Sequence, residues 1–467
     1  MTRFILNDTL VESDAPEGTV VLDIVRYHQH LKGTKIGCRE GDCGACTVLV
    51  GELQDGHVEY RSMNSCLLAL ANVQGRHVVT VEGLNMKELS PVQQAMVDAS
   101  GTQCGICTPG FVVSLSGCCL STAKTDTEAA IRAIDGNICR CTGYKSIERA
   151  AASVAQQLAQ KDTKDPIGWS VTHGFLPAHF SGIKERLAAL ETTGPNVPAH
   201  GVVVAGGTDL YVQKHDTMHH APVRTLSGDN ALKSIRIEGD QCIIGGGATA
   251  ADLMDSVVLQ RLLPGLERHL LLISSTPIRN MGTVAGNFVN ASPIGDLTAM
   301  FIALDSTITL NGTKGERRVK LKDLYKGYKQ LDKSPDEVLT SVRFRIPDTN
   351  TRFHFEKVSK RTHLDIASVN TAIRLELDGD VIREAHASAG GVGPTPKHLA
   401  QTSAFLAGKP VTSATIRAAA QVMNDEIAPI SDVRGTADYK RLLLRQLFFA
   451  HFMELFPERF TLKELAA

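Results

Sequence analysis

The stretch GCREGDCGACTV, residues 37–48, decides how the first part of this chain folds. Its three cysteines are separated by four and then two residues, and a fourth follows about twenty residues later. This is the spacing with which plant-type ferredoxins hold a 2Fe-2S cluster. The glycines between the cysteines can adopt positive φ and bring backbone N–H groups close to the inorganic sulfurs. The sequence therefore predicts one 2Fe-2S cluster with four thiolate ligands: Cys38, Cys43, Cys46 and Cys66.

A second set of four cysteines follows as two pairs, in QCGICTPG (residues 103–110) and NICRCTGY (residues 137–144). Each pair precedes an expected helix, Pro109–Leu120 with Thr108 as N-cap, and Ser146–Gln160. The partial positive charge of a helix N-terminus favours thiolates and an anionic cluster. The alternative is a zinc or thiol-redox site, since C-x-x-C also marks those. The pairs predict a second 2Fe-2S cluster with these ligands: Cys104, Cys107, Cys139 and Cys141.

The composition excludes several classes of protein. The 467 residues carry a formal net charge of -1, without the basic blocks typical of nucleic-acid binding or a long apolar run. The first residues lack the apolar region of a signal peptide, so we expect a cytoplasmic protein whose cysteines stay reduced. Cys118, Cys119 and Cys242 lie in apolar stretches and are predicted to be buried in the core.

The first part of the chain resembles the ferredoxin plan, a small mixed sheet with one helix. Thr19 is the expected N-cap of a helix that runs to His28. The expected strands, the first two forming a hairpin around Asn7-Asp8, are Arg3–Asn7, Leu10–Glu12, Cys46–Leu53, His57–Ser62 and Arg76–Val81.

The chain then becomes helical, and later alternates strands with helices. Further helices are predicted at Pro91–Ala99 and Thr125–Ile134, and a polar linker begins at Lys161. The later strands are expected at Gly201–Ala205, Gln241–Gly245, Phe353–Val358, Ala367–Leu375 and Ile382–Ala389, with a helix starting at Ala250 and two or three more at the end.

Three other patterns have a plain structural reading beside a functional one. IIGGGATAAD, residues 243–252, matches the G-x-G-x-x-A dinucleotide fingerprint, but the flanking segments do not form a clean βαβ series. His215, His219 and His220 suggest a metal trio, although a solvated loop is the simpler interpretation. Lys357 is interpreted as an ordinary surface charge.

Five motifs, in chain order, resemble those of the molybdenum hydroxylases: GCREGDCGACTV, QCGICTPGF, NICRCTGY, AGGTDL and IRNMGTVAGNFVNASPIGD. The resemblance covers essentially the whole chain. Within the family, the chain is similar to the small, iron–sulfur and FAD subunit of bacterial xanthine dehydrogenases, because the two cofactor parts are fused here and no molybdenum domain accompanies them.

The resemblance implies a multidomain α+β fold. The implied domains are a ferredoxin-like β-grasp 2Fe-2S domain (1–85), a helical 2Fe-2S domain (86–160), a linker (161–174), a vanillyl-alcohol-oxidase-type FAD domain (175–348) and a small α+β C-terminal flavoprotein domain (349–467).

The same motifs imply the residues that contact FAD. Gly206, Gly207, Thr208 and Asp209 would wrap the diphosphate, because a glycine turn presents backbone N–H groups to an anion. Asp296 would close the site on the ribityl or diphosphate side. The remaining implied contacts are Thr283, Gly286 and Asn287, with Ile273, Leu339 and Lys357 aligned more loosely.

The chain departs from the family pattern at two points near the flavin. Ala285 stands where related chains often have the first glycine of GGN. Leu364, between His363 and Asp365, stands where related enzymes often carry adjacent acids. Because this type of flavin domain does not use the G-x-G-x-x-A fingerprint, the resemblance assigns residues 245–250 a structural role.

The implied function is an electron relay in purine catabolism. A molybdopterin-binding large subunit would hydroxylate hypoxanthine to xanthine and then urate. This chain would pass single electrons through two 2Fe-2S clusters to FAD and on to NAD, in a complex of two small and two large subunits. The resemblance places no catalytic residue on this chain, and implies no nucleic-acid or membrane partner.

Two alternatives from other classes stay open. One is an iron–sulfur flavoprotein reductase that works alone, or a subunit of another molybdenum hydroxylase that oxidises aldehydes or N-heterocycles. The other is a chain whose dinucleotide fingerprint binds NAD while its flavin domain is vestigial.

Overall fold

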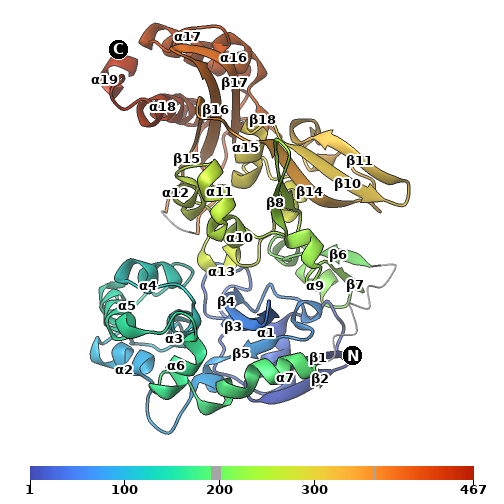
Figure 1. The fold of residues 1–467 in the computed structure, drawn as a ribbon, viewed down its shortest axis with the longest axis vertical. Helices are drawn as coiled ribbons and strands as arrows, with labels where there is room; N and C mark the ends of the chain where they lie inside the picture. Colours follow the sequence, from blue (N-terminus) through green and yellow to red (C-terminus); the bar gives the residue numbers. More distant parts are fainter. Residues whose placement is uncertain (191–200, 362–363, 467) are drawn as a thin grey trace. The chain divides into compact units, whose positions relative to one another are not determined.

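The computed structural model describes residues 1–190, 201–361 and 364–466, which form two compact units (Figure 1). The first unit comprises Met1–Gly228 together with Ser275–Gly282, and the second comprises Asp229–Ser274 together with Thr283–Ala467. Both helices and sheets are present, and the predicted multidomain α+β fold is confirmed. The domain boundaries expected from the sequence stay predictions.

The first unit begins with a five-stranded sheet in the order β2-β1-β5-β3-β4. β1 pairs in parallel with β5, and the other pairs are antiparallel. The predicted hairpin is confirmed, and Asn7 adopts a positive φ of 55° at its turn, which a short polar side chain tolerates. The strands are β1 Thr2–Leu6, β2 Thr9–Ser13, β3 Thr47–Gln54, β4 His57–Asn64 and β5 His77–Val79.

The expected helix with a Thr19 cap is wrong in detail. The helix α1, Val21–Asp23, has no side-chain cap, and it widens at once into a π-helical turn, Ile24–His28. The Thr19 hydroxyl instead donates a hydrogen bond, 3.4 Å long, to the carbonyl of His219. The Thr19 hydroxyl, which the local sequence pattern assigned to the start of the helix, thus bonds to a residue 200 positions away.

The helical part of the first unit follows, and its apolar faces form one core with the sheet. The described helices are α2 Pro91–Asp98, α3 Thr108–Leu120, α4 Thr127–Ala133, α5 Lys145–Gln157, α6 Pro166–Thr172 and α7 Ile183–Ala189. The predicted N-cap of α3 is displaced by one residue, since Cys107 occupies the cap and Thr108 is already helical. The burial predicted for Cys118, Cys119 and Cys242 is confirmed.

The expected linker, 161–174, is more ordered than its polar composition indicated. It contains α6, and Lys161 is buried because its ammonium donates hydrogen bonds to the Cys118 carbonyl (2.6 Å) and the Thr125 hydroxyl (3.2 Å). The first unit ends with β6 Val202–Val204, α8 Leu210–Gln213, α9 His215–Met218, β7 Val223–Thr225 and the short helix α13 Thr276–Arg279.

The second unit contains an antiparallel sheet in the order β11-β10-β14-β9-β8 with helices around it. Its strands are β8 Ile235–Glu238, β9 Gln241–Gly245, β10 Thr307–Gly312, β11 Gly315–Lys320 and β14 Val338–Arg345, with a small ribbon of β12 Tyr325–Gly327 and β13 Gln330–Leu331. The helices are α10 Ala250–Asp255, α11 Val257–Leu262, α12 Leu266–Leu271, α14 Val284–Asn290 and α15 Asp296–Ala303.

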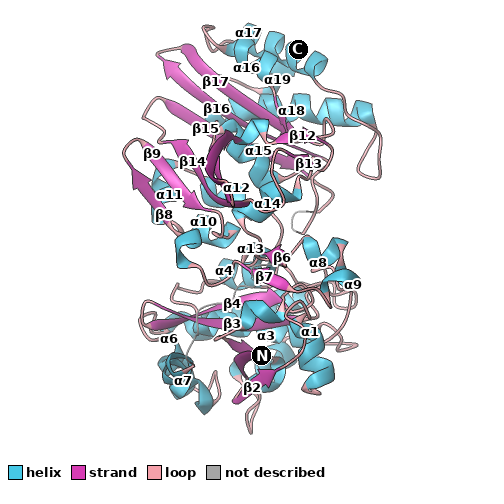
Figure 2. Cartoon of the chain, turned by 90° about the vertical axis from the view of Figure 1, so that its right-hand side faces the viewer, coloured by secondary structure: helices cyan, strands magenta, loops and turns pink. Residues whose placement is uncertain are grey.

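The end of the chain adds an antiparallel sheet in the order β15-β16-β17-β18, which carries helices α16–α18 against it (Figure 2). The three predicted strands are confirmed at β15 Thr351–Val358, β16 Val369–Asp378 and β17 Val381–Gly390. The remaining elements are β18 Lys397–His398, α16 Ala400–Leu406, α17 Ser413–Glu426, α18 Ala437–Leu455 and α19 Leu462–Ala466.

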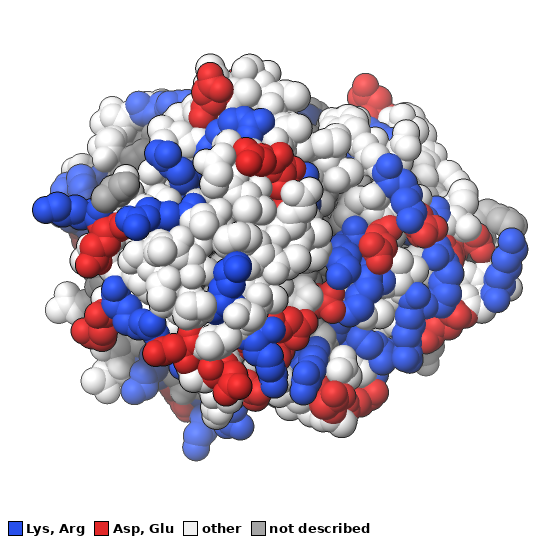
Figure 3. Space-filling view, turned by 90° about the horizontal axis from the view of Figure 1, so that it is seen from above, with Lys and Arg blue, Asp and Glu red and all other residues white. Residues whose placement is uncertain are grey.

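Two surface properties follow from these elements. On the face in Figure 3, basic side chains lie beside acidic ones, as the near-zero net charge leads us to expect. In the part of the chain that the structure describes, no helix is long and apolar enough to cross a lipid bilayer.

Candidate iron–sulfur and flavin sites

The first four cysteines converge as two pairs. The Cys38 and Cys43 thiols are hydrogen-bonded to each other, and so are Cys46 and Cys66. The charge of Cys38 also acts on Cys46 and Cys66, so all four sulfurs lie in one electrostatic neighbourhood. The residues fit a 2Fe-2S cluster, which needs two thiolates on each of two irons.

Hydrogen bonds prepare one thiol of each pair to ionise. The bond with Cys43 is the main reason that the pKa of Cys38 falls to about 5, and the Glu40 N–H also donates to its sulfur at 3.3 Å. The bond with Cys66 lowers the pKa of Cys46. The pKa values of the two partner thiols rise, because each shares its proton with the thiolate beside it. Iron binds the thiolate form, so these are suitable ligands.

The second four cysteines also converge as two pairs. Cys107 is hydrogen-bonded to Cys139, and Cys104 to Cys141. Burial raises the pKa of Cys107 to about 12. Burial also acts to raise the pKa of Cys139, but hydrogen bonds led by those from Thr142 outweigh it and lower that pKa.

The alternative to a cluster at each cysteine site is a mononuclear zinc centre, which needs three or four ligands on a single ion. Within residues 1–190, 201–361 and 364–466, no three His, Cys, Asp or Glu side chains are arranged to hold one metal ion. The same finding covers the expected histidine trio.

The two cysteine sites are connected by one backbone and one side-chain hydrogen bond in the first unit. The Ile138 N–H donates to the Cys43 carbonyl at 3.0 Å, and the Asn137 amide donates to the Gly44 carbonyl at 3.1 Å. Ile138 directly precedes Cys139 in the chain. A ligand segment of the first set is thus hydrogen-bonded to a ligand segment of the second, although about a hundred residues separate them.

The glycine turn after β6 has the geometry of an anion site. Gly207 adopts φ +78°, and a Cβ there would lie 3.1 Å from the Leu67 carbonyl oxygen. A Cβ on Gly206 would overlap the Met281 carbonyl oxygen. In the described parts of the chain, the N–H groups of Gly206, Gly207 and Thr208 donate no hydrogen bond. Such a turn fits the diphosphate of FAD, because only glycine fits the space and the N–H groups remain for an anion.

The other residues expected to contact FAD lie in the second unit. The Thr283 hydroxyl caps α14 by accepting from the Gly286 N–H at 3.0 Å. The Asn287 side-chain oxygen accepts from the Thr298 N–H at 3.1 Å and from its hydroxyl at 2.9 Å. This side-chain oxygen therefore helps to fix the start of α15, and contact of Asn287 with FAD stays a prediction.

Asp296 and Lys357 form a buried ion pair of 2.8 Å, with side-chain exposures of 11% and 2%. The interpretation of Lys357 as a surface charge is therefore wrong. Its ammonium also donates to the Leu272 carbonyl at 2.8 Å. Asn370 donates to Asp296 at 2.6 Å. Sequence reasoning missed Asn370, because a single asparagine in a strand has no motif.

The two apolar residues of the expected flavin set belong to the core of the second unit. Ile273 is 6% exposed and Leu339 is 3% exposed. Leu339 lies on β14 and pairs with Leu310 on β10. Their packing explains why the positions are apolar, and their contact with FAD stays a prediction.

The glycine loop at 245–250 is structural. Its N–H groups are used within the fold, since Gly245, Gly246 and Gly247 donate to the carbonyls of Ser234, Thr340 and Leu232 at 2.7–2.8 Å. The preceding strand, β9, has antiparallel neighbours on both sides. A dinucleotide fingerprint needs a parallel βαβ unit with free N–H groups, so the vestigial-flavin alternative with NAD on this loop is not supported.

Two further expectations differ from the structure or lie outside it. His215 begins the short helix α9 and its ring stacks at 6.4 Å on that of His219, so the expected solvated loop is wrong at this end. Asp365 accepts a hydrogen bond from the Arg361 N–H at 2.8 Å. His363 lies outside the described residues.

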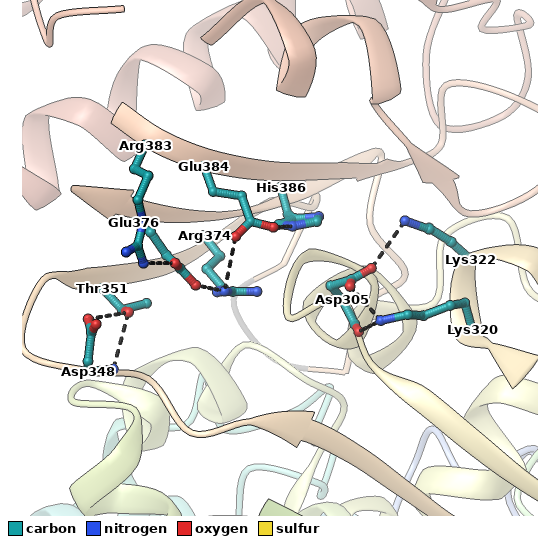
Figure 4. A network of polar contacts seen from close by, with 10 residues as sticks. All are labelled: Asp305, Lys320, Lys322, Asp348, Thr351, Arg374, Glu376, Arg383, Glu384 and His386. Atoms are coloured by element: carbon teal, nitrogen blue, oxygen red, sulfur yellow. Dashed lines mark hydrogen bonds and ion pairs between the residues drawn. The ribbon is translucent and has the colours of Figure 1, made fainter. Parts of the chain in front are cut away.

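Figure 4 shows another group of polar and charged side chains, which come from β11, β15, β16, β17 and the segments beside them, including the turn after α15. Glu376 contacts both Arg374 and Arg383. Asp305 receives the Lys320 ammonium at 2.5 Å. Because these carboxylates are matched by basic partners, we assign the group a structural role that joins neighbouring strands.

Four family models match successive parts of the chain. They describe a 2Fe-2S iron–sulfur cluster binding domain (residues 4–71), a [2Fe-2S] binding domain (80–152), an FAD binding domain in molybdopterin dehydrogenase (181–348) and a CO dehydrogenase flavoprotein C-terminal domain (354–455). The models confirm that the chain carries two 2Fe-2S domains and an FAD-binding domain.

Curated relatives match nearly the whole chain. A xanthine dehydrogenase of Emericella nidulans is 27% identical over 98% of this chain, and one of Oryza sativa subsp. japonica is 27% identical over 95%. Aldehyde oxidase 1 of Bos taurus is 25% identical over 96%. The chain spans about two fifths of the length of these relatives, 38–39%.

Solved structures match about half of the chain. A carbon monoxide dehydrogenase from Hydrogenophaga pseudoflava has a TM-score of 0.51 at 27% identity, over 53% of this chain and 86% of that one. A reconstituted CO dehydrogenase from Oligotropha carboxidovorans has a TM-score of 0.52 at 28% identity, over 55% and 90%. With the domain order and the two cysteine sites, these findings show that the chain belongs to the molybdenum hydroxylase family of oxidoreductases.

Proposed function

We propose that this chain is the iron–sulfur and FAD part of a xanthine dehydrogenase, with a purine as substrate and NAD as acceptor. One observation carries the proposal. Xanthine dehydrogenases align with 94–98% of the chain, across the iron–sulfur and flavin domains, whereas the CO dehydrogenase chains cover 53–55%. The fused order of domains is thus shared with the xanthine dehydrogenases, and also with aldehyde oxidase 1 of Bos taurus.

The cofactors define what the residues do. When bound, 2Fe-2S clusters carry single electrons, and FAD exchanges one or two, so the set links a two-electron oxidation to NAD reduction. We assign the eight paired cysteines as iron ligands. The free N–H groups at residues 206–208 bind the FAD diphosphate, and Asp296 with Lys357 shapes the flavin site of the second unit. NAD is a co-substrate.

A molybdopterin-binding large subunit completes the proposed enzyme, in an assembly of two small and two large subunits. Its docking surface on this chain surrounds the second cysteine site. There Cys104 and Cys141 are exposed, and Ile106 and Tyr144 present apolar surface at 50% and 38% exposure. Exposed apolar side chains beside exposed cofactor ligands are typical of an interface that excludes water from an electron-transfer contact.

The test measures two activities on one preparation of the full chain loaded with both clusters and FAD. The chain alone is expected to oxidise NADH with an artificial dye and to leave xanthine unchanged. Adding the molybdenum subunit restores xanthine-dependent reduction of NAD. Xanthine turnover by the isolated chain would contradict this division of labour.

Charge reversal separates docking from the internal relay. Arg140→Glu changes an exposed residue between two ligands and is expected to weaken subunit association about fivefold, in line with the roughly 1 kcal/mol of an interfacial rim charge. NADH–dye activity should stay within twofold. Lys184→Glu, an exposed residue on α7, is the matched control. Equal loss of both activities in Arg140→Glu would place its effect inside the chain.

One alternative has specific support. Aldehyde oxidase 1 of Bos taurus matches 96% of the chain at 25% identity, close to the xanthine dehydrogenases. Comparing xanthine, an aldehyde and an N-heterocycle as substrates of the native complex, with NAD and dioxygen as acceptors, distinguishes the two. A native complex without molybdenum would favour a reductase that works alone.

A further inference from the structure

The Asp296 carboxylate is held from two sides by the β15–β16 strand pair. Lys357 on β15 and Asn370 on β16 are directly opposite each other in the antiparallel register, so both side chains leave the same face of the sheet. Lys357 donates to one carboxylate oxygen of Asp296 at 2.8 Å, and Asn370 donates to the other at 2.6 Å. The next position across the sheet is Gly390, which has no side chain.

The orientation of the Asn370 amide is fixed by its partners. Its nitrogen donates to the Asp296 carboxylate and to the Ile294 carbonyl at 3.1 Å, and both of these groups can only accept. The residue is fully buried, at 0% exposure. Its side-chain oxygen is buried without a hydrogen-bond partner in the described structure. A buried oxygen without a partner is unfavourable. We therefore interpret the two hydrogen bonds that the amide nitrogen donates as the reason that an asparagine occupies this position.

The charge count explains why the residue is an amide. Asp296 and Lys357 contribute one buried negative and one buried positive charge. Lys357 is the residue opposite Asn370 on β15, Gly390 is the residue opposite it on β17, and Asp296 is its contact on α15. A second carboxylate at position 370 would add a buried charge beside the first, and two carboxylates this close resist ionising together.

We infer that Asn370 is a positioning residue for the flavin: it holds the Asp296 carboxylate, and with it the turn at 292–296, in the orientation that FAD requires. This inference rests on the proposed assignment of Asp296 to the flavin site. Asn370 acts by donating its amide hydrogens and does not itself touch the reacting atoms.

The experiment measures FAD release from the full-length, cluster-loaded protein on dilution, followed by FAD fluorescence, at pH 8 and pH 6. Asn370→Asp is expected to raise the FAD dissociation constant about tenfold at pH 8 and by less at pH 6, because a lower pH favours a proton shared between two carboxylates that lie this close. Asn370→Ala, which adds no charge, should raise it about fivefold at both pH values, since it leaves one oxygen of Asp296 unpaired. The matched control is Thr371→Val on the same strand, whose hydroxyl donates to the Ser388 carbonyl, and it should stay within twofold.

The cluster EPR signals and far-UV circular dichroism verify that each variant is folded. FAD affinity within twofold of the unmodified chain in both Asn370 variants, at both pH values, overturns the inference. If Asp296→Asn then still lowers FAD affinity, the assignment of Asp296 to the flavin survives without Asn370. If Asp296→Asn also binds FAD normally, that assignment fails as well. A Thr371→Val loss equal to that of Asn370→Ala would also overturn the inference, by showing a general effect of disturbing β16.

Discussion

The two cysteine sites of the first unit use the same number of thiols in different settings. At the first site, the ligands lie in a glycine-rich loop and a strand end, two are buried and none is exposed. At the second, the pairs precede helices α3 and α5, and Cys104 and Cys141 are exposed. The comparison shows that four cysteines can be enclosed by a loop or placed before helix N-termini. Only the second arrangement leaves two of the four cysteines exposed on the surface of this chain.

The largest expected effect separates the two sites outright. The intact protein should contain about four irons and four acid-labile sulfides per chain, two of each per cluster. Cys43→Ser is expected to abolish or distort one reduced EPR signal and spare the other, and Cys139→Ser to do the converse, because each removes one of four ligands. Zinc in place of iron in protein purified anaerobically would contradict both assignments.

A second prediction uses the glycine turn that packs on the first site. Gly207→Val places a branched side chain at φ +78°, 3.1 Å or less from the carbonyl of Leu67, the residue after Cys66. We expect FAD affinity to fall at least about tenfold, since a left-handed conformation costs a β-branched residue 1–2 kcal/mol or more. The EPR signal of the first cluster should broaden while that of the second is unchanged.

The contrasting variant for this prediction lies in the other glycine loop. In Gly247→Ala, the added Cβ meets the Leu232 Cβ and the Leu232 carbonyl oxygen, each at 3.1 Å, which is a packing effect within the second unit. FAD content should therefore be retained even if stability falls. Loss of FAD from this variant, with Gly207→Val unaffected, would reverse the roles of the two loops.

A third prediction concerns access. The second cluster should be lost about ten times faster than the first when the isolated protein is treated with a chelator under mild oxidation, because two of its thiols are exposed and reactivity follows exposure. The two EPR signals are followed in time on one sample. Equal rates would mean that the glycine loop encloses its cluster less well than its burial indicates.

The smallest expected effect is the pH dependence that His77 gives to the first sheet. Burial also lowers the pKa values of four histidines of the second unit, His269, His354, His398 and His451. His77 on β5 is fully buried, and its ring lies between the Tyr60 hydroxyl (2.6 Å) and the Asn7 carbonyl (2.8 Å). Burial lowers its pKa from 6.5 to about 3. The unfolded chain therefore binds a proton at His77 below pH 6.5, whereas the folded chain binds it only below about pH 3. The free energy of unfolding falls as the pH falls through this window.

The loss amounts to about 1.4 kcal/mol per pH unit below roughly pH 6. The hydrogen-exchange protection factors of the β1 and β5 amides, which correct for the slower intrinsic exchange at lower pH, should fall accordingly between pH 6.5 and 4.5, and more than those of α3, since residues 91–157 contain no histidine. His77→Gln should flatten the dependence, and His173→Gln, at an exposed position, should not. An unchanged slope in His77→Gln would assign the effect to other groups.

Local sequence determined the features that depend on spacing and periodicity. The cysteine spacing predicted both sets of cluster ligands, because a cluster fixes the number and separation of thiolates close in the chain. Strand alternation gave the hairpin and the terminal strands to within a few residues. The glycine turn at 206–209 was singled out through the resemblance of AGGTDL to a motif of the family, and its contact with FAD stays a prediction.

Only the tertiary structure decided which of two similar glycine loops uses its N–H groups within the fold, and which polar groups are buried. The loops at 206–209 and 245–250 are alike in sequence, and they differ because the carbonyls of Ser234, Thr340 and Leu232 occupy the N–H groups of the second. The local sequence predicts a surface charge at Lys357, but in the structure the side chain is buried and forms an ion pair with Asp296, 61 positions earlier. The physical reason is the same in each case: hydrogen bonding and charge pairing are satisfied by residues remote in sequence, which no local pattern contains.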